Sequence, residues 1–161
     1  MEALLVWLEG SALGEFMRSS GVWAYGVVNL VHILGIATLF GSVLALDLRL
    51  LGLWRRVPLA SIETPTLTLA ACGFGVAVAS GMCLLSTNGT EYVGNPFLTL
   101  KLSAIGLGLV NVVTVQFLPV WRRRAIEPHG PRERLALRII GGTSLACWSM
   151  AVACGRMIGY W

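Results

Sequence analysis

Long apolar runs, each wide enough to cross a bilayer, dominate the pattern along the chain. A helix needs about 20 mostly apolar residues to span a membrane. Four stretches meet this requirement, namely residues 22–46, 67–86, 97–120 and 135–160. Because backbone groups in lipid must be satisfied within the segment, the pattern predicts an all-α, integral-membrane four-helix bundle over residues 21–161.

Residues 1–20 have a more mixed pattern. Their apolar residues do not form a clean stripe at 3.6-residue spacing, and Glu2 stands where a signal peptide would carry a basic residue. We therefore predict a retained N-terminal segment that precedes the bundle. It is either a short interfacial helix or a disordered or partner-bound arm.

Composition agrees with a membrane protein: 56% of the residues are hydrophobic and 12% are charged, and the mean hydropathy is +0.76. The net charge is +4, and most of the basic residues follow the first and third predicted spans. They are Arg49, Arg55, Arg56, Arg122, Arg123, Arg124, Arg132, Arg134 and Arg138. The positive-inside rule places these two loops in the cytoplasm and both termini outside. Anionic lipid accounts for this charge, so we expect no nucleic-acid partner.

Polar side chains inside the predicted spans are the candidates for function, because they are costly in a bilayer unless they have a partner. Tyr25, Asn29 and His32 follow one another at i, i+4 and i+7 and therefore share one face of the first span. Helical rise places His32 about 15 Å below the outer surface, near the middle of the membrane. Met150 on the fourth span comes out at a similar depth.

Two cations are predicted above that level. Lys101 on the third span lies about 8 Å below the outer surface, and Arg156 on the fourth span lies at a similar depth. The layout suits a b-type haem with His32 as axial ligand and Met150 as the second metal ligand. Lys101 and Arg156 would then hold its carboxylates, and Tyr25 and Asn29 would position His32. Each residue also has a structural interpretation, as a hydrogen-bonded helix contact, a core filler or a side chain that snorkels to the interface.

Two segments carry a family resemblance. "VHILGIATLFGSVLALDLRLLG" resembles the first span of small bacterial membrane proteins of the CopD-like superfamily, and "NPFLTLKLSAIGLGLVN" resembles their third span. The related HemJ-type protoporphyrinogen oxidases bind b-type haem and depend on an early-span His and a later-span Lys. The resemblance matches these residues to His32 and Lys101 and implies a multi-pass protein of the bacterial inner (cytoplasmic) membrane.

The resemblance has one clear departure. The HemJ-type proteins carry an Arg about two turns after the His, where this chain has Phe40. That difference removes support for the porphyrinogen-oxidising activity itself. Whether the protein is an enzyme is left open, and either a quinone or a porphyrin fits as the partner of an electron-transfer or oxidoreductase subunit.

Two other classes of function remain open. The first is copper transport or resistance, because soft sulfur ligands suit Cu(I). These ligands are Cys147, Met150, Cys154 and Met157 on the fourth span, with Met82 and Cys83 on the second. The second is a structural or assembly subunit of a larger membrane complex, in which His32 and Asn29 form interhelical hydrogen bonds. Either a homo-oligomer or a subunit of a membrane complex fits all three classes.

Asp47 and Arg49 close the first span and are two residues apart, which puts them about 200° apart around a helix. They cannot readily pair with each other. We expect Arg49 to reach the cytoplasmic headgroups. Asp47 should accept a hydrogen bond or ion pair from a donor outside the first span. The basic residues of the loop between the third and fourth spans are the preferred donors.

Overall fold

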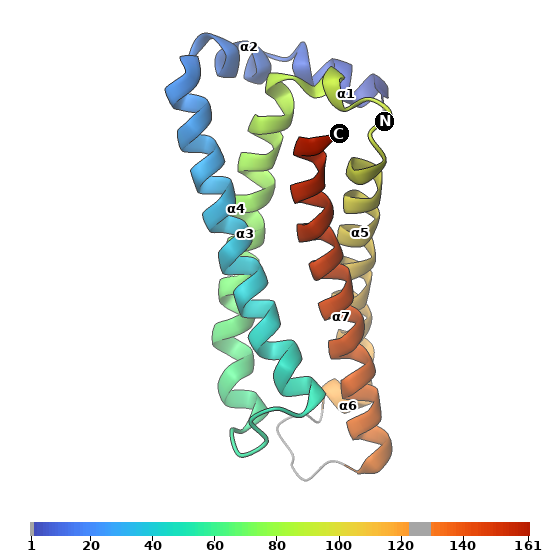
Figure 1. The fold of residues 1–161 in the computed structure, drawn as a ribbon. Coiled ribbons are helices and arrows are strands. Elements are labelled where there is room, and N and C mark those ends of the chain that lie inside the picture. Colours follow the sequence, from blue (N-terminus) through green and yellow to red (C-terminus); the bar gives the residue numbers. More distant parts are fainter. Residues whose placement is uncertain (1, 123–129) are drawn as a thin grey trace.

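The structure is a computed structural model that describes residues 2–122 and 130–161 (Figure 1). Its described residues form helices that short turns and loops connect, and none of them lies in a strand. The elements are α1 (Glu2–Glu9), α2 (Ala12–Ser19), α3 (Gly21–Leu51), α4 (Leu59–Thr87), η1 (Gly89–Tyr92), α5 (Pro96–Phe117), α6 (Pro119–Arg122), α7 (Pro131–Met157) and η2 (Ile158–Tyr160).

Four of these helices, α3, α4, α5 and α7, are long and apolar enough to cross a membrane, which confirms that the four apolar runs form long helices. The first two are longer than their apolar runs. α3 continues to Leu51 and stops at Gly52, whose left-handed backbone (φ 111°) places its N–H on the carbonyls of Leu48 and Arg49. Glycine adopts that conformation without the strain of a side chain and so ends the helix. α4 begins at Leu59, directly after Pro58, rather than at residue 67.

The long helices form two closely packed pairs, α3 with α4 and α5 with α7, and α3 also packs against α7 (Figure 1). Glycine makes the first pairing close: a Cβ built on Gly73 would lie 2.5 Å from the backbone nitrogen of Leu39. Gly141 does the same for α3 and α7, where a Cβ would lie 3.1 Å from the carbonyl oxygen of Asp47. Small residues let membrane helices approach in this way.

Many apolar side chains point away from the bundle. Trp23 is 90% exposed and Leu107 is 62% exposed. In water such a surface would be costly, but lipid chains are as apolar as leucine. The exposed surface therefore fits a multi-pass protein whose helices face lipid.

The N-terminal segment is helical and packs on one end of the bundle (Figure 1). Leu5 and Met17 are buried. Arg18 donates hydrogen bonds to the carbonyls of Ser86 and Thr87 at the end of α4, both at 3.3 Å. The segment is therefore docked on the protein, while its place at a membrane interface stays a prediction.

The opposite end of the bundle holds the main apolar cluster. The short helix α6 turns Trp121 inward, where it is 3% exposed. The cluster consists of Leu46, Leu50, Leu59, Val115, Trp121, Leu137 and Ile140. It joins α3, α4, α5, α6 and α7 at this end.

Candidate functional site

His32 is held by a side chain on the neighbouring helix. Its Nδ1 lies 3.0 Å from the hydroxyl oxygen of Ser80 on α4. That hydroxyl lies 2.5 Å from the carbonyl oxygen of Val76, which can only accept. Since a serine has one hydroxyl proton and donates it to Val76, its oxygen accepts the N–H from Nδ1. The neutral imidazole then carries its free lone pair on Nε2, the nitrogen available to a ligand.

A glycine gives the imidazole its space. A Cβ built on Gly81 would lie 3.0 Å from Cε1 of His32 and 3.9 Å from Nε2. The half-buried ring therefore lies against the backbone of α4 at the residue after Ser80. An alanine at position 81 would require the ring to shift by a few tenths of an ångström.

Lys101 approaches the same region from α5. Its side chain passes over Gly155 of α7, where a Cβ would lie 3.5 Å from Nζ and 3.6 Å from Cε. Its charge interacts with the buried Cys154 and with His32. The structure thus brings His32 and Lys101, which are far apart in the sequence, within electrostatic range of each other.

Tyr25 and Asn29 are both exposed, Tyr25 by 40%. The hydrogen bonds that orient the imidazole are those with the Ser80 hydroxyl and the Ala77 backbone, both on α4, rather than bonds with Tyr25 or Asn29. Tyr25 interacts instead with Tyr92 of η1, whose pKa is raised by burial and then by its phenolic and acidic neighbours. Sequence reasoning missed Ser80, although a serine followed by glycine inside an apolar span is a usable signal.

Arg156 and Met150 lie on exposed surface of α7. Arg156 donates a hydrogen bond to the hydroxyl of Tyr160, and its guanidinium carbon lies 4.6 Å from the centre of that ring. Met150 is 47% exposed, whereas Cys154, one turn further on, is 3% exposed. The predicted face of soft ligands is therefore divided between the interior and the surface. Within residues 2–122 and 130–161 no group of three or more His, Cys, Asp or Glu side chains could hold a metal ion.

Asp47 and Arg49, near the end of α3, are both buried and contact other parts of the protein. Asp47 accepts a hydrogen bond from Ser144 on α7, so its donor does lie on another span but is a hydroxyl. Residues 123–129, which carry several of the expected basic donors, lie outside the described residues. The expectation for Arg49 was wrong: it is 9% exposed, and its Nε donates to the carbonyl of Val57 at 2.8 Å. The chain folds back after Gly52, so the guanidinium holds that loop instead of extending outward.

Four apolar helices of spanning length define the class of this molecule, an all-helical protein that fits a multi-pass place in a membrane. The chain belongs to the DUF6644 family, described as a family of unknown function, whose sequence profile matches residues 4–161. No curated protein and no solved structure matches the chain significantly. The family therefore covers nearly the whole chain but carries no known function. The function has to be inferred from the site.

Proposed function

We propose that the protein is a haem-b-binding electron-transfer or oxidoreductase subunit of the bacterial inner membrane, with Nε2 of His32 as an axial ligand. The hydrogen bond between His32 and Ser80 carries the proposal. Ligating histidines usually donate their second ring N–H to a fixed acceptor, which sets the tautomer and the ring orientation. Haem iron takes such an imidazole as its usual protein ligand.

Lys101 supports the same proposal. A haem carries two carboxylates, and a lysine within electrostatic range of the ligating histidine can pair with one of them. The donors near His32 therefore fit the group in part, with one imidazole and one ammonium. When bound, the haem would supply one-electron chemistry. His32 would orient it and Lys101 would hold its charged edge.

The second axial ligand calls for a partner. Met150 is 47% exposed, so an interface with another copy or another subunit would cover its thioether and let it ligate iron away from water. The proposal therefore includes a homo-oligomer or a membrane complex, with a quinone or a porphyrin as the electron partner. Arg156 would hold a carboxylate only after leaving Tyr160.

The orientation belongs to the proposal too. We place both termini outside and the Arg55 and Arg122 loops in the cytoplasm, because basic loops are retained there. The N-terminal helices would then lie at the outer interface. Leu4, Trp7 and Phe16 support this, since each is more than 60% exposed, at 63%, 67% and 64%, and amphipathic interfacial helices present such side chains to lipid.

The test is the absorption spectrum of the full chain, purified in detergent after expression with ample haem. We expect a Soret band and reduced-state α and β bands in the wild type and their loss in His32→Ala. Replacement of the chain's other histidine, His129→Ala, is the matched control and should keep the bands. Ser80→Ala should retain the ligand but loosen it, and Lys101→Ala should be milder still because it removes charge pairing and not the iron bond. A colourless wild type would contradict the proposal.

A structural or assembly subunit is the second candidate, and the same hydrogen bond favours it. The bond joins α3 to α4, and interhelical bonds of this kind contribute about 1 kcal/mol in membranes. If that is its whole role, His32→Ala and Ser80→Ala should each destabilise the bundle, and no haem should copurify. Copper has less support because its predicted ligands are divided between the interior and the surface.

A further inference from the structure

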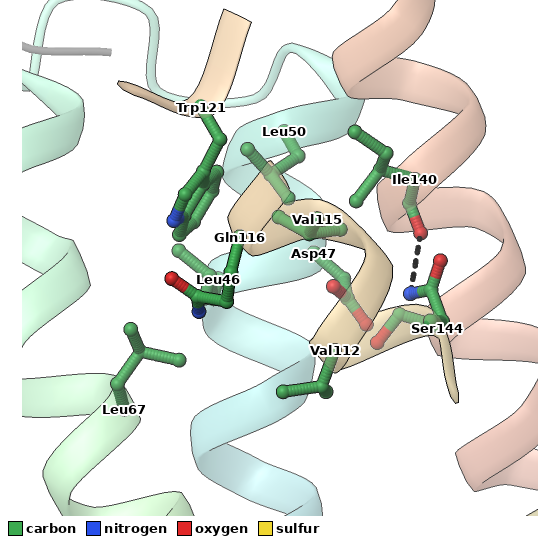
Figure 2. Close-up of a pocket in the computed structure, with 11 residues that line it drawn as sticks. Leu46, Asp47, Leu50, Leu67, Val112, Val115, Gln116, Trp121, Ile140 and Ser144 are labelled. Atoms are coloured by element: carbon green, nitrogen blue, oxygen red, sulfur yellow. Dashed lines mark hydrogen bonds between the residues drawn. The ribbon is translucent and has the colours of Figure 1, made fainter. Parts of the chain in front are cut away.

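A cavity of about 50 Å³ lies at the α6 end of the bundle, between α3, α5 and α7 (Figure 2). Asp47 is 15 residues beyond His32 along α3, which corresponds to about 22 Å, so the cavity is separate from the proposed haem site. The polar residues in its wall are Asp47, Asn111, Gln116, Trp121 and Ser144. A cavity of this size holds a water molecule or an ion.

Asp47 is a buried carboxylate with one oxygen that lacks a hydrogen-bond partner among the described residues. It is 3% exposed, and its carboxylate points toward Ser144 (Figure 2). Ser144 donates one hydrogen bond to it, while Oδ2 has no hydrogen-bond partner in the described part of the chain. A buried carboxylate is costly unless a positive charge or several donors compensate it.

The wall of the cavity offers no such charge. Of the residues described there, Asp47 is the only charged one, and the others are apolar or neutral. The cavity therefore has a local negative charge and a single unsatisfied carboxylate oxygen. Both features favour a cation as the occupant.

Asn111 and Ser144 line the same cavity and carry side-chain oxygens. The amide nitrogen of Asn111 donates to the carbonyl of Ile140 at 3.4 Å, which leaves its Oδ1 available as an acceptor. The hydroxyl of Ser144 gives its proton to Asp47 and keeps lone pairs on its oxygen. Carboxylate, amide and hydroxyl oxygens are the ligands that hard cations prefer.

We propose that this cavity binds a small monovalent cation of the sodium type, held by Asp47, Asn111 and Ser144. One carboxylate suits a single positive charge, whereas calcium sites in proteins gather more carboxylates. Soft metals are excluded from this wall because its described residues offer no sulfur or imidazole ligand. A proton on Oδ2 would neutralise the carboxylate. It would not occupy the cavity or bind the oxygens of Asn111 and Ser144.

The test is the thermal stability of the full chain, purified in detergent and titrated with sodium chloride. Choline chloride holds the ionic strength constant. Because an ion that binds the folded state stabilises it by mass action, the melting temperature should rise with the logarithm of sodium concentration above the dissociation constant. Asp47→Asn, of the same shape and neutral, should abolish the rise. Ser144→Ala and Asn111→Ala should each raise the apparent dissociation constant roughly tenfold by removing one oxygen ligand.

Glu15→Gln is the matched control, since it removes an exposed carboxylate on α2 and should leave the sodium response unchanged. If Asp47→Asn does not fold, the wild type decides: sodium and lithium must differ from choline at equal ionic strength. Equal melting temperatures in all three salts would overturn the proposal. A stability that depends on pH but is unchanged by sodium would identify Asp47 as a proton-binding group and would overturn it as well.

Discussion

Gly73→Ala should loosen the pairing of α3 and α4, which positions both His32 and Ser80. The added Cβ would lie 2.5 Å from the backbone nitrogen of Leu39 and 2.8 Å from the carbonyl oxygen of Gly35. Both are backbone atoms, so no side-chain rotation relieves the contact. To reach an ordinary 3.4 Å, the helices must separate by about 0.9 Å (3.4 − 2.5) at this point.

The magnitude follows from that separation. Overpacking of a filled interior costs about 1–3 kcal/mol, and a gap of 0.5–1 Å forfeits roughly a quarter to a half of the dispersion energy of the separated contacts. We therefore take about 3 kcal/mol as the cost. Alanine is favoured over glycine within a helix by about 1 kcal/mol, so the net loss of stability is about 2 kcal/mol.

Gly75→Ala is the matched control on the same helix, because a Cβ there meets nothing within 4 Å. It should gain up to about 1 kcal/mol from helix propensity alone. The two free energies of unfolding can be compared by titration with SDS in mixed micelles, followed by circular dichroism. Equal stability of the two variants would refute the close packing of α3 on α4.

The remaining predictions concern the N-terminal segment and the orientation. The backbone N–H of Thr90 donates to Glu9 at 2.7 Å, and this bond lowers the pKa of the Glu9 carboxyl group. Because the lowered pKa belongs to the folded state, docking of the segment should be fully stabilised above the ordinary carboxyl pKa and should weaken as the pH falls through the lowered value. Proteolysis of residues 1–20 should therefore increase at low pH, and Glu9→Gln should remove that dependence; a cleavage rate that is flat with pH in the wild type would argue against the contact. In a cysteine-free background, Glu91→Cys should react with an impermeant reagent from outside intact cells; reaction only after permeabilisation would invert the topology. Glu91 is a better labelling position in this loop than Gly89, because a Cβ at position 89 would lie 3.1 Å from the carbonyl oxygen of Leu5.

Hydropathy predicted the four spans because spanning a bilayer constrains both length and composition. It could not predict where each helix ends. The last residues of α3 are held by Gly52 and by the contact of Arg49 with Val57, which are local and tertiary features rather than apolar ones.

Periodicity grouped residues on helix faces but could not tell which face meets protein. In a soluble helix the apolar stripe marks the core, whereas in a membrane the lipid is as apolar as the interior. Tyr25 and Asn29 therefore share a face with His32 in sequence, yet both are exposed. For the same reason Met150 looked like a partner of His32 at equal depth, although it lies on exposed surface.

Partners on other helices were the least predictable part of the site. The pairing of His32 with Ser80 and of Asp47 with Ser144 depends on which helices are neighbours and how they are rotated. Ser80 is marked in the sequence only by the glycine that follows it, and Ser144, which is followed by leucine, lacks that signal. The glycines at positions 81 and 141, which the sequence alone presents as general packing residues, lie at those two pairings, and Gly73 lies where α3 and α4 approach closely.

The central claim, that His32 ligates haem iron through Nε2, is tested most directly by imidazole rescue. Purified wild type and His32→Ala are each titrated with haem in detergent, and binding is followed at the Soret band with and without added imidazole. We expect that the wild type binds haem without imidazole, that His32→Ala does not, and that free imidazole restores the wild-type spectrum by occupying the space left by the ring. Equal binding by His32→Ala without imidazole would contradict it.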